Sequence, residues 1–324
     1  MNKVTGNDKS ASRDESPFHA GEQAVQKRLG VRDAAEQLGR AMIRPFMPDQ
    51  HREFFHNLVY LFVGISDEEG LPWATILTGQ PGFISSPNNR RLQIRVLSSY
   101  QTLAIKQLKP GRAVGLLGID LAKRRRNRLN GVVAAVTTKG AVVEIDIAVH
   151  ESFGNCPQYI QAREVSPRQQ PEDFNPGEVL IDNVFNAPVK TLMTRADTFF
   201  IATQHRHDDG LNRGSADISH RGGEPGFVHV ENDKTAVFPD YRGNRHFNTL
   251  GNLSLDSGAG LLFIDFTNGD ALQLRGASKI LWDDPRQSDF PGAERLIEFT
   301  LQESCWMPGS IALRWHKIDK KPRH

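Results

Sequence analysis

This 324-residue chain has only two cysteines, no long apolar run and almost no net charge. Cys156 and Cys305 lie far apart, which argues against a disulfide framework and fits a reducing compartment. Lys+Arg 40 against Asp+Glu 38 leaves +2, too balanced for a dedicated nucleic-acid binder. No apolar stretch approaches the roughly 18 residues that cross a bilayer, and the polar N-terminus lacks a secretory apolar segment. We therefore expect a cytoplasmic protein that binds neither nucleic acid nor membrane.

Several common catalytic signatures are also missing. The chain has no Walker-type phosphate loop, no G-x-G-x-x-G between a strand and a helix, and no serine-hydrolase elbow. His205, His207, Asp208 and Asp209 have the composition of a metal site, but they crowd into one turn without a partner motif, which favours a plain loop. Cys156 could be a redox thiol, although a small buried cysteine in a turn is commoner. We expect no metal.

Short elements follow one another along the chain. Residues 20–43 carry a helical pattern that Gly30 interrupts, which predicts two helices, and Pro48 opens a short third helix. The next segments are short, apolar and separated by turns, as in a β-barrel core. Strands are expected at about 59–65, 73–77, 82–85, 92–96, 113–121, 131–137 and 141–146.

The composition divides the chain into four parts. Residues 1–17 form a polar tail, and residues 18–165 hold the N-terminal helices and a first barrel. A proline-rich, charged linker follows at 166–185. The pattern then restarts in residues 186–324, which form a second barrel. Its first expected elements are a helix at 186–193, a strand at 198–203 and a turn at 208–210.

The restart is an internal repeat. GQPGFI, which begins at Gly79, recurs as GEPGFV at Gly223, 144 residues later. Two further matches stand 145 residues apart, namely GLLGID at Gly115 with GLLFID at Gly260, and LNG at Leu129 with LRG at Leu274. Three matches at nearly one displacement predict two copies of one barrel, packed as a dimer within a single chain.

The second copy carries polar residues where the first has none. Ser219, His220, Arg221 and Gly222 stand where the first copy has Thr75-Ile-Leu-Thr78. A later loop, Arg242-Gly-Asn-Arg245, places two guanidiniums around a glycine, and its counterpart near Ser98–Gln101 has no arginine. Guanidinium forks fit phosphate oxygens, and glycine lets backbone N–H groups approach an anion. These residues predict a phosphate site, with a basic turn in water as the alternative.

The first copy has its own basic stretch, Lys123-Arg-Arg-Arg-Asn-Arg128. A nucleic-acid patch would need interleaved aromatic residues, which this stretch lacks. For Lys123 and Arg124 alone, a solvated hairpin is the stronger interpretation. The anion-binding features are thus divided between the two copies.

Three segments carry a resemblance to a known family. Ser219–Val228, Phe238–Arg245 and Phe153–Ile160 are similar to a bacterial branch of the split-barrel flavoproteins related to pyridoxamine 5′-phosphate oxidase. The resemblance covers about residues 18–318. It implies a mainly β fold with flanking helices, in which two FMN-binding split barrels form an intrachain pseudo-dimer and hold FMN between them.

The resemblance also implies which residues bind FMN. The phosphate side would comprise Ser219, His220, Arg221, Gly222, Arg242, Asn244 and Arg245. The ring side would come from the first copy, through Arg126, Asn127, Arg128 and the Asn155–Tyr159 turn with Cys156 and Tyr159. The equivalent second site lacks the arginines, so one FMN per chain is expected. For His220, a structural hydrogen bond to a carbonyl is an equal alternative.

Two functions remain open at this point. The first is an FMN-dependent oxidoreductase of unknown substrate, using a small molecule or an electron donor such as NADH or NADPH. Because the flavin would carry the redox chemistry, no catalytic side chain is assigned. Vitamin B6 oxidation is not expected, since the oxidase's substrate-binding Lys, Tyr, Arg and Ser cannot be placed. The alternative is a flavin- or haem-binding carrier or sensor without turnover. Further pairing into a homodimer also stays open.

Overall fold

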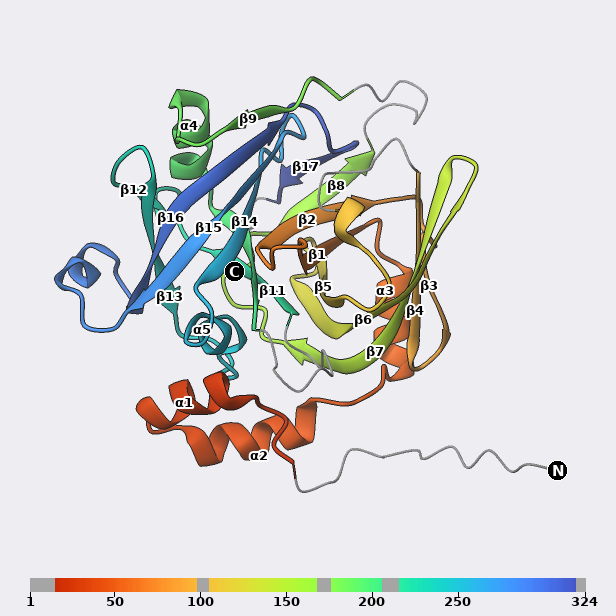
Figure 1. The fold of residues 1–324 in the computed structure, drawn as a ribbon, viewed down its shortest axis with the longest axis horizontal. Coiled ribbons are helices and arrows are strands. Elements are labelled where there is room, and N and C mark those ends of the chain that lie inside the picture. Colours follow the sequence, from red (N-terminus) through yellow and green to blue (C-terminus); the bar gives the residue numbers. More distant parts are fainter. Residues whose placement is uncertain (1–14, 98–104, 168–175, 206–215, 319–324) are drawn as a thin grey trace, which may run out of the picture.

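Two large antiparallel β-sheets lie side by side in the computed structural model, with short helices around them (Figure 1). The structure describes residues 15–97, 105–167, 176–205 and 216–318. Most of the predicted tail and the turn at 208–210 lie outside these residues. No helix in the described ranges is long and apolar enough to cross a membrane.

The first half begins with three helices. Gly30, at φ +65°, separates the first two, so the predicted interruption is confirmed. The helices are α1 (Ala20–Arg28), α2 (Arg32–Met42) and α3 (Asp49–His56). The strands are β1 (Tyr60–Ser66), β2 (Pro72–Thr78), β3 (Ile84–Asn88), β4 (Arg91–Leu97), β5 (Ala113–Asp120), β6 (Arg125–Lys139) and β7 (Val142–Asn155).

The second half follows a similar plan with its own helices. The predicted helix near residue 186 is confirmed as α4 (Ala187–Arg195), capped by the Asn186 side chain. The other elements are β10 (Thr198–Gln204), β11 (Ala216–Gly222), β12 (His229–Val230), β13 (Thr235–Tyr241), α5 (Asn248–Leu253), β14 (Gly258–Ile264), β15 (Ala271–Leu281) and β16 (Ala293–Met307).

The two sheets have the same strand order. It runs β2-β1-β5-β6-β7-β4-β3 in the first and β11-β10-β14-β15-β16-β13-β12 in the second. A register shift recurs in β6 at Gly131 and in β15 at Gly276. A Cβ there would lie 2.1 Å from the Ala148 carbonyl oxygen and 2.0 Å from that of Thr300, respectively. Only glycine admits such a backbone approach, so the LNG and LRG matches have a common structural cause.

The two G-x-P-G-F segments also adopt the same backbone turn. Phe83 and Phe227 each donate their N–H to the carbonyl three residues earlier, at 2.9 and 3.0 Å. The preceding glycines, Gly82 and Gly226, have φ of +87° and +93°. Because this segment is a turn, β3 begins only at Ile84, and the strand expected at 82–85 is wrong at its start.

Two further boundaries differ from the sequence prediction. β6 begins at Arg125, six residues before the expected strand, so that Arg125–Arg128 belong to a strand. Both ends of the expected linker at 166–185 pair with strands of the second half. β8 (Arg163–Pro167) pairs with β17 (Leu313–Lys317), and β9 (Leu180–Asp182) pairs with β16.

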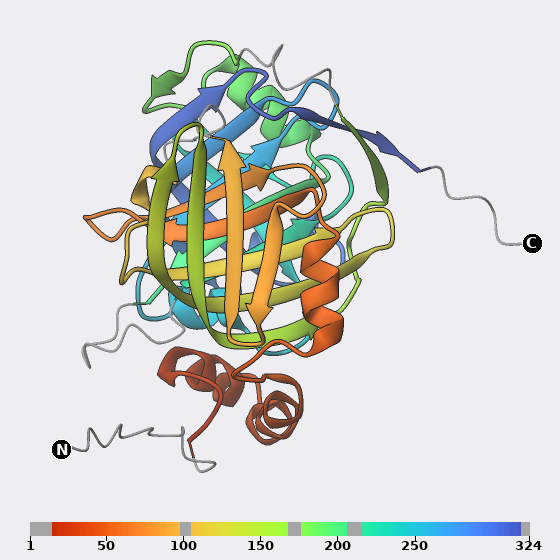
Figure 2. The same cartoon turned by 90° about the vertical axis from the view of Figure 1, so that its right-hand side faces the viewer.

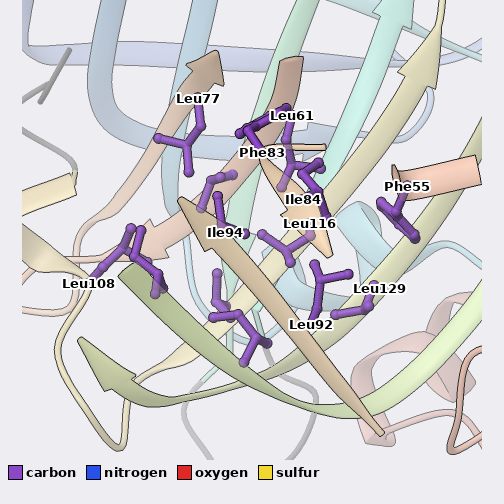
Figure 3. Close-up of a cluster of buried hydrophobic side chains, with 14 of the residues drawn as sticks. Phe55, Leu61, Leu77, Phe83, Ile84, Leu92, Ile94, Leu108, Leu116 and Leu129 are labelled. Atoms are coloured by element: carbon purple, nitrogen blue, oxygen red, sulfur yellow. The ribbon is translucent and has the colours of Figure 1, made fainter. Parts of the chain in front are cut away.

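Each sheet encloses its own apolar core. Figure 3 shows the first, where Leu61, Ile94, Leu116 and Leu129 point toward one another from four strands. A separate cluster joins the two halves, and at its centre the rings of Phe62 and Phe200 stack with centroids 3.5 Å apart. Burial of such aromatic rings is the main favourable term in bringing the sheets together.

Glycines allow the sheets to come this close. A Cβ on Gly115 of β5 would lie 2.9 Å from the Ala216 carbonyl oxygen of β11. A Cβ on Gly260 of β14 would lie 2.4 Å from the Pro72 carbonyl oxygen of β2. The two contacts are reciprocal, so each half lays its edge strand, β2 or β11, across the other half. This places β11 directly against β5 and β6.

We expect Gly260→Ala to lower the free energy of unfolding by roughly 1–3 kcal/mol, because the added methyl group meets backbone and forces the sheets apart. Urea unfolding measures the change. Gly243→Ala is the matched control, since no atom lies within 4 Å of the position that its methyl group would take. Equal stability of the two variants would show that the contact between the sheets is not tight.

Candidate functional site

A pocket lies where the second sheet meets the ends of β6 and β7. Its cavity volume is about 100 Å³, and residues of both halves line it. Eight of the twelve predicted site residues are among them, namely Arg126, Arg128, Cys156, Ser219, His220, Arg221, Asn244 and Arg245. In the structure, predicted site residues from the two halves therefore lie together. Arg128 and Ser219, for example, are 91 residues apart in the sequence and share a hydrogen bond.

The other four predicted residues lie around the pocket. Asn127 lines a neighbouring groove. Tyr159 has φ +63° and stacks its ring on Tyr241, which lines the pocket, at 5.1 Å. Gly222 is adjacent to this turn, since a Cβ there would lie 2.2 Å from the Tyr159 carbonyl oxygen. Arg242 is exposed and is not part of the pocket wall.

The innermost contact is a buried ion pair between the halves. Arg128 of β6 and Asp217 of β11 are 3% and 2% exposed, and their charged atoms lie 2.5 Å apart. Arg128 also donates to Ser219 Oγ at 2.7 Å and to Asn248 Oδ1 at 2.8 Å. Thr249 Oγ1 donates to Ser219 Oγ at 3.0 Å. Through this ion pair and these hydrogen bonds, Arg128 therefore holds the neighbouring polar side chains in place.

Arg221 belongs to a second ionic network. Its guanidinium lies 2.7 Å from Asp240, which also holds the buried Arg295 at 2.6 Å. Asp240 is the one carboxylate that lines the pocket within the described chain, and it is shared by two arginines. Arg221 is thus already paired, whereas Arg245 lines the pocket, is exposed and makes no ion pair within the described ranges.

Within the described residues, His220 contacts a guanidinium and no backbone carbonyl. Arg126 Nη1 lies 3.2 Å from His220 Nδ1. Burial, together with the charges of Arg126 and Arg221, lowers the pKa of His220 well below its ordinary value. The imidazole is neutral, and because a guanidinium only donates, Nδ1 accepts and the proton is on Nε2. That Nε2 has no partner in the described part of the chain.

Arg126 makes no ion pair with a carboxylate of the described residues. Burial and the charge of Arg128 lower its pKa to about 10. The Nε atoms of Arg126, Arg128 and Arg221 are buried and make no hydrogen bond within the described residues. Several unpaired donors thus surround one pocket, and an anion or a group rich in acceptors would satisfy them.

The N-terminal helices pack against the loop and the helix α5 that line this site. Asn248 Nδ2 donates to Glu22 Oε1 of α1, and Gln26 Nε2 donates to the His246 carbonyl at 3.2 Å. A Cβ on Gly21 would lie 2.1 Å from the Gly251 carbonyl, so α1 and α5 are in backbone contact. Figure 2 shows α1 and α2 beneath the strands, and Figure 1 shows α1 below α5.

Sequence reasoning missed several of these residues. Asp217 could have been found, because it stands two residues before Ser219 and so faces the same side of the strand. Asn248 and Thr249 follow directly after the arginine loop. Glu22 is 226 residues from its partner Asn248, and no local pattern marks it.

The equivalent position in the other half is small, and its described lining carries hydroxyl and apolar side chains but no charge. Its walls include Thr75, Ile76, Ala271 and Met307, with no arginine among the described residues. Of the basic stretch, Lys123 is exposed and pairs with Asp120 at 3.4 Å, and Arg124 is exposed in a turn at φ +52°. The solvated-hairpin interpretation of these two residues is therefore confirmed.

No metal cluster is present among the described residues. His207, Asp208 and Asp209 lie outside them. Neither described cysteine forms a disulfide: Cys156 is partly exposed at the pocket, and Cys305 is buried, which raises the pKa of its thiol to about 11.

Comparison with known proteins gives structural likeness only. No protein-family model and no curated protein matches the chain. A HupZ protein of Group A Streptococcus matches at TM-score 0.30 and 12% identity, over 38% of this chain and 98% of its own. A putative pyridoxamine 5′-phosphate oxidase from Lactobacillus delbrueckii matches at 0.28 and 16%, over 34% and 95%. An FMN-binding protein from Syntrophomonas wolfei matches at 0.26 and 10%, over 40% and 94%.

The similar structures thus include a protein named for the family that the motifs resemble. Each aligns nearly its whole length with 34–40% of this chain. At these TM-scores the likeness carries no argument about what this chain binds.

The partly buried carboxyl of Glu151, behind the pocket, predicts a pH dependence of stability. Burial, reinforced by Asp217, raises the pKa of Glu151 to about 7. A raised folded-state pKa means that Glu151 binds its proton more tightly in the folded chain. The stability that the folded chain gains from this tighter proton binding is therefore lost as pH rises from about 4.5 to about 7. We expect Glu151→Gln to raise the free energy of unfolding at pH 8 by an amount on the order of 2 kcal/mol, and to change little at pH 4.5.

Thermal or urea unfolding at the two pH values measures this difference. Glu144→Gln, on the same strand, is the control, because Lys139 and Arg95 lower the pKa of that partly exposed carboxyl. A stabilisation by Glu151→Gln that is equal at both pH values would contradict the assignment.

Proposed function

We propose that this pocket binds FMN and that the protein is an FMN-dependent oxidoreductase. One observation carries the proposal: unpaired donors from both halves surround a pocket whose single described carboxylate is already paired with two arginines. Such a pocket favours a ligand with a dianionic group and additional acceptors. FMN is the candidate because the motifs around Ser219, Arg245 and Cys156 resemble those of the FMN-binding split barrels.

The residues present fit the two ends of such a ligand. Arg245 offers an unpaired charge for a phosphate, whereas the hydroxyl protons of Ser219 and Thr249, which line the same pocket, are already donated to Asp217 and Ser219. Arg126 and the Nε2–H of His220 offer donors for the carbonyl and nitrogen acceptors of a flavin ring. When bound, FMN would supply the hydride and electron transfer, and the protein would bind, orient and electrostatically tune it.

The described ion pairs give these donors fixed positions before any ligand arrives. Asp217 holds Arg128, which in turn positions Ser219 and Asn248. Asp240 holds Arg221 at one Nη and leaves its Nε unpaired. Preorganised donors cost little conformational entropy on binding, and this favours affinity.

We also infer that the two sheets are copies of one FMN-type split barrel, arranged as an intrachain pseudo-dimer with one flavin site. Their common strand order, the recurring bulge and the common G-x-P-G-F turn support this. The equivalent second position is small and has no charged residue in its described lining, which supports a single site.

The purified protein gives the direct test of function. A yellow protein whose flavin absorbance is bleached by NADH or NADPH supports the oxidoreductase. A protein that binds FMN but exchanges no electrons with any donor supports a carrier or sensor. A colourless protein that takes up haem and excludes FMN overturns the proposal.

The phosphate assignment predicts a selective loss. Arg245→Ala removes an unpaired charge from the pocket, so FMN affinity should fall about tenfold, equivalent to roughly 1.4 kcal/mol. Riboflavin, which has no phosphate, should bind variant and parent equally. Because Arg242 does not line the pocket, Arg242→Ala should cost less than Arg245→Ala.

Fluorescence titration with the two ligands measures these affinities, and Lys234→Ala in an exposed turn controls for the general loss of a positive charge. If FMN and riboflavin weaken in parallel in Arg245→Ala, this arginine supports the loop and does not bind phosphate.

A further inference from the structure

A groove continues from the pocket toward the N-terminal helices. The two hollows share Arg126, Asn155, Cys156 and Asn244. Beyond these the groove is lined by Met42 at the end of α2, Gln50 and His51 of α3, Arg125 and Asn127 of β6, and Gly154 of β7. The groove therefore adjoins the pocket, and a second ligand bound in the groove would lie next to a ligand bound in the pocket.

The groove carries uncompensated positive charge. No carboxylate lines it in the described chain. The guanidinium of Arg125 lies 4.7 Å from the Phe54 ring centroid, and its Nη2 is 3.5 Å from the Gln50 carbonyl. Neither partner neutralises it. The nearby acids are engaged elsewhere, since Asp49 pairs with Arg52 at 2.9 Å and Asp120 with Lys123 at 3.4 Å.

His51 adds a neutral polar group to this wall. Its Nδ1 lies 2.8 Å from Ser152 Oγ. Burial, followed by the positive charges of Arg44 and Arg125, lowers the pKa of the imidazole. Burial disfavours a charge of either sign, whereas the two guanidiniums repel cations and attract anions.

Asn127 provides a second polar group without a partner. The residue is 4% exposed and lines the groove, and its buried amide nitrogen makes no hydrogen bond within the described residues. A buried donor left unpaired costs free energy until an acceptor reaches it. Arg125 and Asn127 therefore both favour an acceptor that carries negative charge.

We infer that this groove binds the anionic oxygen group, a carboxylate or a phosphate, of a second ligand that lies beside the cofactor. The inference rests on the proposed function and deepens it, because it assigns the substrate or electron donor to the anionic class. Arg125 is the residue that selects the charge, and the amide of Asn127 donates to the same ligand.

The test uses the full-length protein saturated with FMN and three probes of one shape: phenyl phosphate, benzoate and benzamide. Calorimetry gives their affinities, and the flavin absorbance reports binding next to the ring. We expect at least one anion to bind at least tenfold more tightly than neutral benzamide. The stronger of phenyl phosphate and benzoate identifies a phosphate or a carboxylate group.

Two variants locate the site. Arg125→Gln should weaken the preferred anion at least tenfold, and by more than it weakens FMN. Arg125→Lys, which keeps the charge but loses the fork, should fall between parent and Arg125→Gln. Lys123→Gln is the matched control, because this neighbouring cation is exposed and outside the groove, and it should leave anion affinity unchanged.

The outcomes separate this inference from the proposed function. Equal binding of benzamide and the anions, or anion binding that Arg125→Gln does not change, overturns the groove assignment even if FMN binds. If the protein does not retain FMN, the proposed function fails. The same calorimetry without flavin then supports the anion site if Arg125→Gln weakens binding, and rejects it if it does not.

Discussion

The close approach of the two sheets is the constraint on which the rest of this structure depends. Gly115 and Gly260 remove the side chains that would separate β5 from β11 and β14 from β2, and the stacked rings of Phe62 and Phe200 fill the centre. Only at this separation can Arg128 of one half reach Asp217 of the other at 2.5 Å. A buried pair of this kind is costly to break, because either partner alone would be an unpaired charge without water. The pair therefore fixes the two halves in one relative position.

The candidate site follows from that arrangement. Arg128 contacts Ser219 and Asn248, Asn248 contacts Glu22, and Asp240 ties Arg221 to Arg295. Most charges are thus used to build the pocket, and the donors that remain, together with Arg245 at the rim, are available to a ligand. This division distinguishes arginines that hold the structure from arginines that can bind an anion. It also explains why the N-terminal helices, which are remote in sequence, belong to the site.

The sequence allowed the positions of most strands of the first half and eight of the pocket residues to be predicted, because those features depend on local motifs and their spacing. Turn glycines and bulge glycines recur wherever the backbone needs them, so Gly82 and Gly226 or Gly131 and Gly276 mark equivalent positions. The pairing of Arg221 with Asp240 was not predictable in the same way, since it depends on side chains reaching across strands. Arg242 and Arg245 look equivalent in sequence, and only the course of the loop places one of them in the pocket wall. Glu22 carries no local signal at all.

The stoichiometry of flavin binding tests the central claim most directly. Calorimetric titration of the full chain with FMN counts sites without any variant or assumed substrate. The account predicts one FMN per chain, since the donors gather at one of the two equivalent positions and no charged residue lines the other among the described residues. Two equivalents per chain, or one per two chains, would contradict a site built from both halves of a single chain, and the absence of binding would contradict the flavin itself.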